Sequence, residues 1–345
     1  MNVRKAIPLF EGHYQPRVPL NGNYYCLLDD GVMEVQAELA KKYGIYGFCY
    51  YHYWFANGKK LLEKPLERML RNPNVDIPFC LCWANENWTR RWDGGNNEII
   101  VAQDYDDMDN LNRHIDYLCE FFADPRYIKH DGKPFFIIYR PVLIPDIKTK
   151  ISYIRERVKQ NGFPGIVIAL QHPSYMMYGK FTEFGADYYI QFEPLFSDFG
   201  RRKEANINDT IKYMLHRAGI LNLLKAVKHI VMKPTVEEKH YSVLDYDALW
   251  KCILNYKPKD KRLIAGVFKD WDNTPRNRSG VIVSGGTPEK FGKYMKMLIQ
   301  KVKKEYALPY IFIDAWNEWG EGAYLEPDER YGYEWLEALK NALNS

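Results

Sequence analysis

Residues 311–322 read Ile-Phe-Ile-Asp-Ala-Trp-Asn-Glu-Trp-Gly-Glu-Gly. The apolar start of this segment predicts a buried strand, and the carboxylates of Glu318 and Glu321 follow it closely. Ionised carboxylates are costly to desolvate, so a strand that only had to be buried would not end in this way. At the C-terminal end of a strand and beside aromatic rings, the two groups are typical of an acid/base pair that faces a sugar. The alternative is a solvated acidic loop, which the surrounding Trp, Asn and Gly residues disfavour.

The rest of the chain alternates between strand and helix patterns, which predicts βα units around a parallel sheet. The expected strands cover residues 44–53, 77–83, 134–139, 165–170, 186–191, 264–268 and 310–315. The expected helices cover residues 31–43, 60–72, 106–123, 146–160, 174–183, 207–230, 246–255, 288–304 and 332–343. No Gly-rich phosphate loop follows a first strand, so a dinucleotide-binding sheet is disfavoured. Seven strands are one fewer than a closed (β/α)8 barrel needs.

Composition limits the classes of function that remain. The 345 residues predict a single domain, 1–345, with an excursion around 193–262 where strand signals are weak. Its 48 basic and 44 acidic residues give a net charge of +4, which is too balanced to favour nucleic acid or an anionic membrane. No apolar run is long enough for a transmembrane helix, and the N-terminus lacks the apolar part of a signal peptide. The six cysteines show no zinc-site spacing, so reduced thiols in the core are expected, which suits the cytoplasm.

Polar and aromatic residues collect where the predicted strands end, and in a barrel this is the active face. Aromatic rings stack on sugar rings, whereas amides and imidazoles bond sugar hydroxyls. We therefore predict Glu318 and Glu321 as catalytic residues. The predicted substrate-binding residues, which surround this pair on the other strand ends, are Tyr51, His52, Trp54, Trp83, Asn85, Glu86, Trp88, Arg90, Trp92, Tyr139, Trp271, Asp272, Trp316 and Asn317.

Several of these residues have a purely structural alternative. His52 is also compatible with a core histidine, and Glu86 with a structural ion pair to Arg90 or Arg91. Asp270 and Asp272 form a DxD pattern, which can hold a metal in nucleotide-sugar transferases. A polar loop is the favoured interpretation of this short pattern.

Four segments resemble the WbsX-like family, whose members belong to bacterial surface-polysaccharide gene clusters. They are residues 12–16 (GHYQP), 43–55 (YGIYGFCYYHYWF), 82–93 (CWANENWTRRWD) and 316–322 (WNEWGEG). The domain of that family is similar to glycoside hydrolase family 99, the endo-α-mannosidase and endomannanase family. The resemblance implies a (β/α)8 barrel that acts on glycans with retention, and no metal or organic cofactor.

The resemblance also assigns roles to the final motif. Glu318 matches the general base and Glu321 the general acid of the hydrolase family. The base is thought to deprotonate the 2-hydroxyl of the sugar, which gives a 1,2-anhydro intermediate. Members of the WbsX-like family begin with a strand that precedes the loop matched by Met1–Lys5. We therefore expect a barrel that lacks the first β-strand.

Three hypotheses follow. The first is a cytoplasmic glycoside hydrolase-like enzyme that acts on an α-linked, mannose-like residue of a surface polysaccharide or its precursor. The second is a glycosyltransferase of O-antigen, capsule or lipopolysaccharide biosynthesis, and the third is a non-catalytic glycan-binding protein. In all three the partner is an oligo- or polysaccharide, and the oligomeric state is left open.

Overall fold

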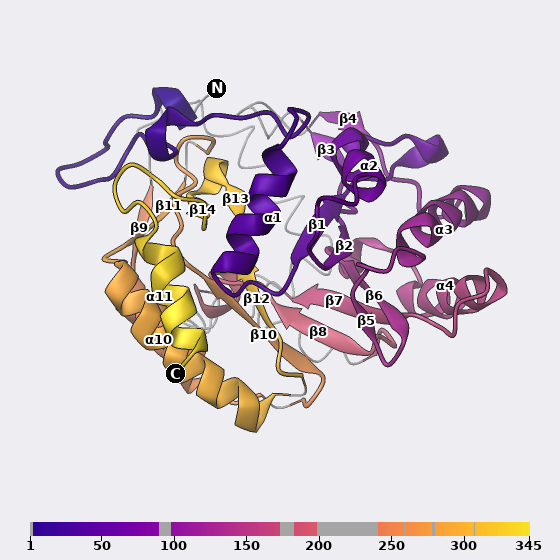
Figure 1. Cartoon of the computed structure of the whole chain (residues 1–345). Helices are drawn as coiled ribbons and strands as arrows, with labels where there is room; N and C mark the ends of the chain where they lie inside the picture. Colours follow the sequence, from indigo (N-terminus) through magenta and orange to yellow (C-terminus); the bar gives the residue numbers. More distant parts are fainter. Residues whose placement is uncertain are drawn as a thin grey trace, which may run out of the picture.

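The computed structural model describes residues 3–89, 98–172, 183–198, 241–258, 260–277, 280–306 and 308–345. Its centre is a curled sheet of parallel strands that follow one another in chain order (Figure 1). In spatial order the strands are β1 (Phe48–His52), β2 (Phe79–Trp83), β6 (Lys133–Ile138), β7 (Val167–His172), β8 (Tyr188–Gln191), β10 (Leu263–Phe268) and β12 (Ile311–Asp314). The short strand β5 (Lys129–His130) pairs antiparallel with β6. The seven strands expected from the sequence are thus confirmed, and they pair as parallel neighbours.

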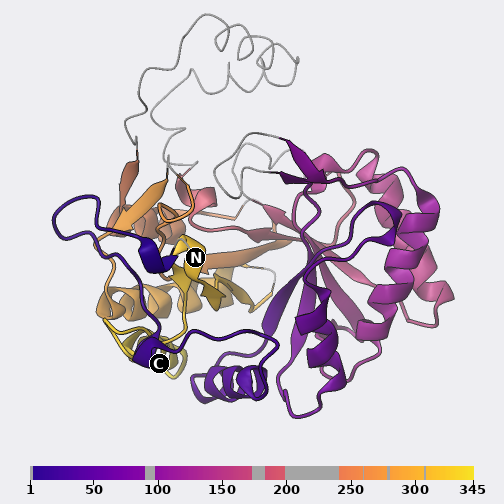
Figure 2. The same cartoon turned by 90° about the horizontal axis from the view of Figure 1, so that it is seen from above.

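Helices lie on the outside of the curled sheet, as the view from above shows (Figure 2). They are α1 (Val32–Lys42), α2 (Glu63–Arg71), α3 (Met108–Phe122), α4 (Ile147–Gln160), α9 (Tyr246–Asn255), α10 (Pro288–Glu305) and α11 (Glu334–Leu343). Each agrees with an expected helix to within a few residues. Helix α10 begins as expected, because the Thr287 side chain accepts a hydrogen bond from the Lys290 amide at 3.2 Å and Pro288 takes the first helical position. The expected helices at 174–183 and 207–230 lie almost wholly or wholly outside the described residues.

Short elements lie at the rim of the sheet, and no sequence pattern was long enough to predict them. The paired short strands are β3 (Trp88–Thr89) with β4 (Ile99–Val101), β9 (Ser242–Asp245) with β11 (Val281–Ser284), and β13 (Asn317–Glu318) with β14 (Ala323–Tyr324). Single 3-10 turns cover Val3–Lys5, Leu20–Gly22, Ala56–Gly58, Pro141–Leu143 and Trp319–Glu321.

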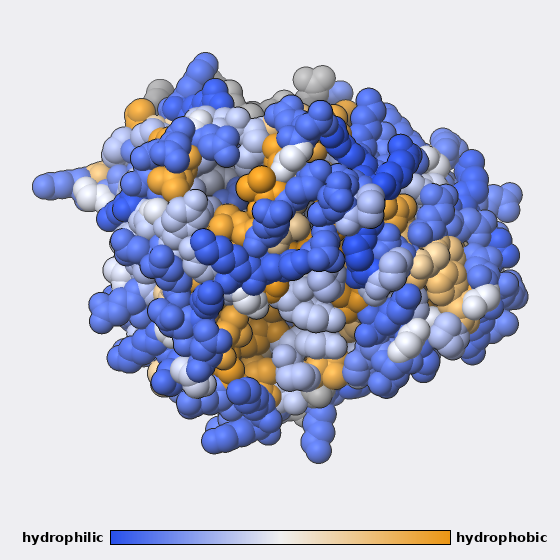
Figure 3. All heavy atoms as spheres, viewed as in Figure 1, coloured by the Kyte–Doolittle hydropathy of each residue, from blue (hydrophilic) through white to orange (hydrophobic). Residues whose placement is uncertain are grey.

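The sheet curls far enough for distant strands to touch. Phe135 of β6 stacks on Phe312 of β12, with ring centroids 6.3 Å apart, although three strands separate β6 from β12 in the sheet. No ladder among the described residues joins β12 to β1. All four residues of β12 are half-buried, and apolar atoms gather on the surface over this strand (Figure 3). This arrangement is an α/β barrel-like fold, and the absence of one particular strand from a complete barrel stays a prediction.

Two further expectations concern the chain as a whole. All six cysteines are free thiols, but only Cys80 and Cys82 are buried, so the expected placement in the core is wrong for the others. Within the described part of the chain, the helices are either too short or too polar to cross a bilayer.

Candidate active site at the carboxyl ends of the strands

The two predicted catalytic glutamates lie on a tight turn directly after β12. Glu318 ends the short strand β13, and Glu321 ends the 3-10 turn Trp319–Glu321. Gly322 closes the turn with φ +66°, a backbone conformation that favours glycine. The Trp319 ring anchors the turn, because its Nε1 donates to Glu326 Oε2 at 2.7 Å and its face stacks on Tyr324. A 3-10 turn brings residues three apart to the same side, which explains the spacing of the two carboxylates.

Arg276, on the loop after β10, contacts both glutamates. Its Nη1 lies 3.6 Å from Glu318 Oε1, and its Nη2 donates a hydrogen bond to Glu321 Oε1. Gly320 leaves room for this arrangement, because a Cβ there would lie 3.1 Å from Glu318 Oε1 and 3.5 Å from Arg276 Cδ. Sequence reasoning missed Arg276, since nothing in its local sequence connects it to a motif 40 residues further on.

A third carboxyl group belongs to the same cluster. Asp314 is the last residue of β12 and lies on the same side of the strand as Phe312, which faces the interior of the curled sheet. Burial raises the pKa of Asp314 well above its ordinary value, and the nearby charges of Glu321 and Glu318 raise it further. Its Oδ2 atom is buried and has no hydrogen-bond partner among the described residues. A protonated Asp314 would therefore be the stable form in the free protein.

The two glutamates differ in environment. The side chain of Glu321 is 16% exposed and that of Glu318 is 42% exposed. Burial raises the pKa of Glu321 to about 7, while the Arg276 guanidinium opposes this rise and the Glu318 charge adds to it. Burial also raises the pKa of Glu318 from 4.5, against the opposing charge of Arg276. A carboxylic acid that holds its proton near neutral pH, beside a more exposed carboxylate, is the arrangement that acid/base catalysis requires.

Three tyrosines line the interior beside these carboxyl groups. Tyr139, after β6, meets Tyr51 of β1 edge to face, with ring centroids 5.7 Å apart. The pKa of Tyr53 is raised to about 12 by burial and, next, by the charge of Glu318. Burial raises the pKa of Tyr51 well above 10, and the Asp314 charge contributes. The Tyr51 side chain is 41% exposed. All three hydroxyls stay protonated and are available to sugar oxygens.

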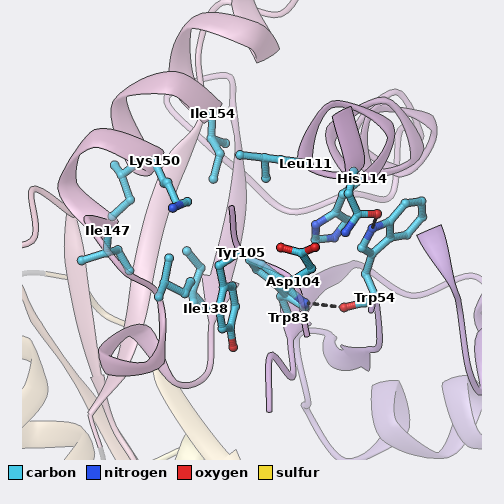
Figure 4. A pocket seen from close by; sticks show the side chains of 13 residues that line it. Trp54, Trp83, Asp104, Tyr105, Leu111, His114, Ile138, Ile147, Lys150 and Ile154 are labelled. Atoms are coloured by element: carbon cyan, nitrogen blue, oxygen red, sulfur yellow. Dashed lines mark hydrogen bonds between the residues drawn. The ribbon is translucent and has the colours of Figure 1, made fainter. Parts of the chain in front are cut away.

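Three of the predicted substrate-binding residues face away from this interior. His52 is buried, and its Nε2 lies 2.8 Å from His114 Nε2 on α3. Trp54 stacks on His114 with centroids 5.0 Å apart, and Trp83 Nε1 donates to the Trp54 carbonyl at 3.3 Å (Figure 4). Burial lowers the pKa of His52 to about 3, so its ring is neutral. Successive side chains of a strand point to opposite faces, so Tyr51 and His52 cannot both face a substrate.

A small cavity adjoins these rings, between the sheet and helices α3 and α4 (Figure 4). Its volume of about 20 Å³ holds roughly one water molecule and no sugar. Trp54, Trp83 and His114 line it together with isoleucines of α4. The structure therefore assigns His52, Trp54 and Trp83 to packing behind the sheet, which corrects their predicted role.

Asn85, Trp271 and Asp272 are also buried in the protein. The Asn85 amide bonds both backbone groups of Arg140, at 2.7 and 2.9 Å, and is fully buried. Trp271 is 4% exposed and belongs to the apolar core. The Asn85 amide is thus used to hold the backbone of Arg140, and burial leaves Trp271 little surface for a substrate.

Asp272 joins the N-terminal segment to the candidate site. Its Oδ2 lies 2.9 Å from His13 Nε2 and accepts from Gln15 Nε2 at 2.5 Å. Its Oδ1 accepts from the Thr274 amide and hydroxyl. Its backbone N–H donates to the Glu321 carbonyl at 2.6 Å. Asp272 thus fixes the loop that carries Arg276 against the turn that carries Glu321, and the motif at residues 12–16 gains a structural explanation.

The remaining predicted residues lie at or near the rim. Glu86 forms an ion pair with Arg140 Nε at 3.0 Å. Trp88 packs edge to face against Tyr53. Trp316 is half-buried against Phe48, and the exposed Asn317 donates from Nδ2 to the Tyr25 hydroxyl at 3.1 Å. Arg90 and Trp92 lie outside the described residues. Across the described ranges, no group of three or more His, Cys, Asp or Glu side chains is arranged to hold a metal ion.

The fold is shared with glycoside hydrolases. A GH99 endo-alpha-mannosidase from Bacteroides thetaiotaomicron superimposes with a TM-score of 0.53 at 14% identity, over 95% of this chain and 82% of the other. A glycoside hydrolase-like protein superimposes with a TM-score of 0.58 at 14% identity, over 94% of this chain and 89% of the other. Identity at this level shows the common fold alone.

The sequence comparison is more specific. Residues 1–339 match the family model described as Glycosyltransferase WbsX, so the chain belongs to the WbsX family, and the resemblance seen in the sequence is confirmed. The uncharacterized protein WxcX from two strains of Xanthomonas campestris pv. campestris is 33% identical over 349 residues. The match covers 99% of this chain and 45% of WxcX, so the chain spans less than half the length of these relatives.

Proposed function

We propose that this chain is a carbohydrate-active enzyme that cleaves or rearranges an α-glycosidic linkage of a bacterial surface polysaccharide or its precursor. The observation that supports this most is the cluster of Glu318, Glu321 and Arg276 at the carboxyl ends of the strands, beside three tyrosine hydroxyls. The endo-alpha-mannosidase of the same fold supports a mannose-like sugar as the substrate. Because the relatives are more than twice as long, the activity of a whole WxcX-like protein is a separate proposal.

In the proposed reaction, Glu321 donates its proton to the glycosidic oxygen as the bond from that oxygen to the anomeric carbon breaks. Glu318 removes the proton of the 2-hydroxyl, whose oxygen then bonds to the anomeric carbon and gives a 1,2-anhydro sugar. In the second step, Glu321 takes a proton from water, and the water oxygen opens the three-membered ring at the anomeric carbon. Glu318 returns its proton to the 2-oxygen. Two inversions give net retention.

The geometry supports these roles in two ways. Burial keeps Glu321 protonated near neutral pH, which suits an acid. Glu318 is more exposed and lies near the Tyr53 ring, so it can reach a sugar hydroxyl in the open space that the tyrosines line. No covalent bond between sugar and protein is needed in this scheme, so two carboxyls on a single turn suffice.

The family description supports a second candidate, a glycosyltransferase. The same carboxyl pair would then pass the sugar from a donor to the hydroxyl of an acceptor glycan instead of to water. Turnover that requires a sugar-nucleotide donor and a divalent cation would distinguish this reaction from hydrolysis. A glycan-binding protein without turnover is the third possibility.

One experiment separates the three. The purified chain is incubated with α-linked mannose-containing oligosaccharides and bacterial surface polysaccharides in H₂¹⁸O, and separately with sugar nucleotides and Mn²⁺. We expect ¹⁸O in the new reducing end, which mass spectrometry detects. Glu318→Gln and Glu321→Gln should each lower turnover by roughly 10³-fold or more while thermal shifts by a mannose-configured iminosugar persist.

The matched control is Asp116→Asn, which makes the same kind of change on the outward side of α3, where Asp116 pairs with Arg157. It should leave turnover unchanged. Full turnover in both glutamate variants would exclude the proposed mechanism. Product that forms only with a sugar nucleotide and Mn²⁺ would favour the transferase.

A further inference from the structure

Arg276 contacts both glutamates, and its hydrogen bond goes to Glu321. The guanidinium donates directly to Glu321, whereas its distance to Glu318 Oε1 is 3.6 Å. A charge-assisted hydrogen bond stabilises the ionised form of a carboxyl group. The positive charge of Arg276 is therefore fixed beside Glu321, the proposed acid, and lies farther from Glu318, the proposed base.

The protein holds Arg276 in this position through its backbone. The Arg276 amide donates to the Asn273 carbonyl at 3.2 Å, and Asn273 Oδ1 accepts from the Val281 amide at 2.8 Å. The same loop is fixed to the catalytic turn by the hydrogen bond from the Asp272 amide to the Glu321 carbonyl. Close contact at Gly322 leaves little room between them, because a Cβ there would lie 2.9 Å from the Asp272 nitrogen. These contacts hold the loop of Arg276 directly against the turn of Glu321.

The groups that face Glu321 come from several elements. Glu318 lies on β13, Asp314 ends β12, Tyr139 follows β6, and Arg276 follows β10. Two of these groups are carboxyls. Each proton that Glu321 gives away leaves a negative charge beside them in a partly buried site, which is unfavourable without a cation.

We propose that Arg276 is a positioning residue that stabilises the carboxylate formed when Glu321 gives up its proton. This inference rests on the proposed function. When Glu321 protonates the leaving oxygen, the carboxylate it becomes is already hydrogen-bonded to the guanidinium. When Glu321 later takes a proton from water, that bond weakens again. Arg276 forms no bond to the sugar.

The first test measures protonation without any substrate. Side-chain ¹³C NMR of protein labelled at glutamate follows the carboxyl titration from pH 4 to 10, and the resonance lost in Glu321→Gln identifies Glu321. In Arg276→Met we expect the Glu321 midpoint to rise by about one pH unit or more, because an opposite charge in contact has been removed. Arg276→Lys keeps a charge and should give a smaller rise. Arg276→Gln is measured as well, in case the apolar variant does not fold.

The control variant is Arg140→Met, which removes a different cation near the rim. Arg140 pairs with Glu86 and does not contribute to the raised pKa of Glu321. The Glu321 midpoint should stay where it is. An unchanged midpoint in folded Arg276→Met or Arg276→Gln would overturn the inference, and so would an equal rise in Arg140→Met.

The second test uses turnover of the glycan found active. Since Glu321 must be protonated, activity falls as pH rises through its pKa, and Arg276→Met should move this alkaline limb upward by about one pH unit. We expect kcat to fall about tenfold with little change in KM, because a weaker acid donates less readily. If the wild-type chain turns over no glycan, the proposed function fails, while the NMR titration still decides the role of Arg276.

Discussion

The loop after β12 and the end of β1 have a similar amino-acid composition, but their side chains are placed differently relative to the sheet. Both carry Trp and polar residues at the carboxyl end of an edge strand. After β12 the chain folds into a 3-10 turn, and Glu318 and Glu321 come to the same side. At the end of β1 the chain stays extended beyond His52, so Tyr51 and Tyr53 lie near the carboxyl groups while His52 and Trp54 pack on α3. Composition alone does not show which side of the sheet a residue faces.

The difference is also one of energetics. Behind the sheet the polar groups are neutral, buried and paired, as His52 with His114 and Trp54 Nε1 with Asn110 Oδ1 at 3.1 Å. In front of it, three carboxyl groups share one neighbourhood and the pKa of each is raised. The first region therefore contributes stability, whereas the second holds groups whose ionisation is unfavourable. Four predictions test this contrast.

The largest effect on stability is expected behind the sheet. Trp54→Ala removes a 6% exposed ring from the contact with His114 and should lower the free energy of unfolding by about 3–5 kcal/mol. Urea unfolding measures this. Trp88→Ala, which removes a half-buried ring on the interior side, should lose clearly less. Equal losses would mean that the two sides are packed alike.

The buried pair of His52 and His114 should make the free energy of unfolding decrease at acidic pH. The pKa of His52 is about 3 in the folded protein against 6.5 unfolded, so its contribution is complete above pH 6.5 and is lost as pH falls toward 3. In wild-type protein, one such group contributes a slope of about 1.4 kcal/mol per pH unit below pH 6. His52→Gln should reduce the slope by this amount, as unfolding at several pH values would show. An unchanged slope would contradict a buried neutral ring.

Glu321 should have the opposite dependence. Its pKa is raised to about 7, so the folded state is most favoured below pH 4.5 and loses stability as pH rises to 7. The loss is on the order of 3 kcal/mol for a shift of this size. Glu321→Gln should be more stable than wild type at pH 8 and similar at pH 4. A variant that is less stable at pH 8 would show that Arg276 already balances the buried charge.

The smallest effect on stability is expected for a hydroxyl that faces the interior. Tyr51→Phe should change the free energy of unfolding by no more than about 0.5 kcal/mol, because the side chain is 41% exposed. It should weaken binding of a mannose-configured iminosugar, which isothermal titration would detect. Unaltered binding together with a large loss of stability would place Tyr51 with the packing residues.

Part of the candidate site was accessible from the sequence. The apolar run 311–313 followed by two glutamates predicted the turn that carries Glu318 and Glu321, and Tyr51 and Tyr139, which lie near it, were predicted with it. Side chains alternate between the two faces of a strand. Extended past the end of β1, this alternation would have placed Tyr53 with Tyr51 and Trp54 with His52. Along β12 it would have placed Asp314 with Phe312. Arg276 had no such signal, because its contact with Glu321 joins residues 45 apart through a loop.

The sequence by itself determined the alternation of strands and helices, the family, and the turn that carries Glu318 and Glu321. These features depend on local periodicity and on short motifs, which act over a few neighbouring residues. Only the tertiary structure decided that Arg276 pairs with Glu321, that Asp272 bonds the turn of Glu321, and that His52, Trp54 and Trp83 pack behind the sheet. Those outcomes depend on which face each strand presents and on loops that meet across the sheet, and the curling of the sheet sets both.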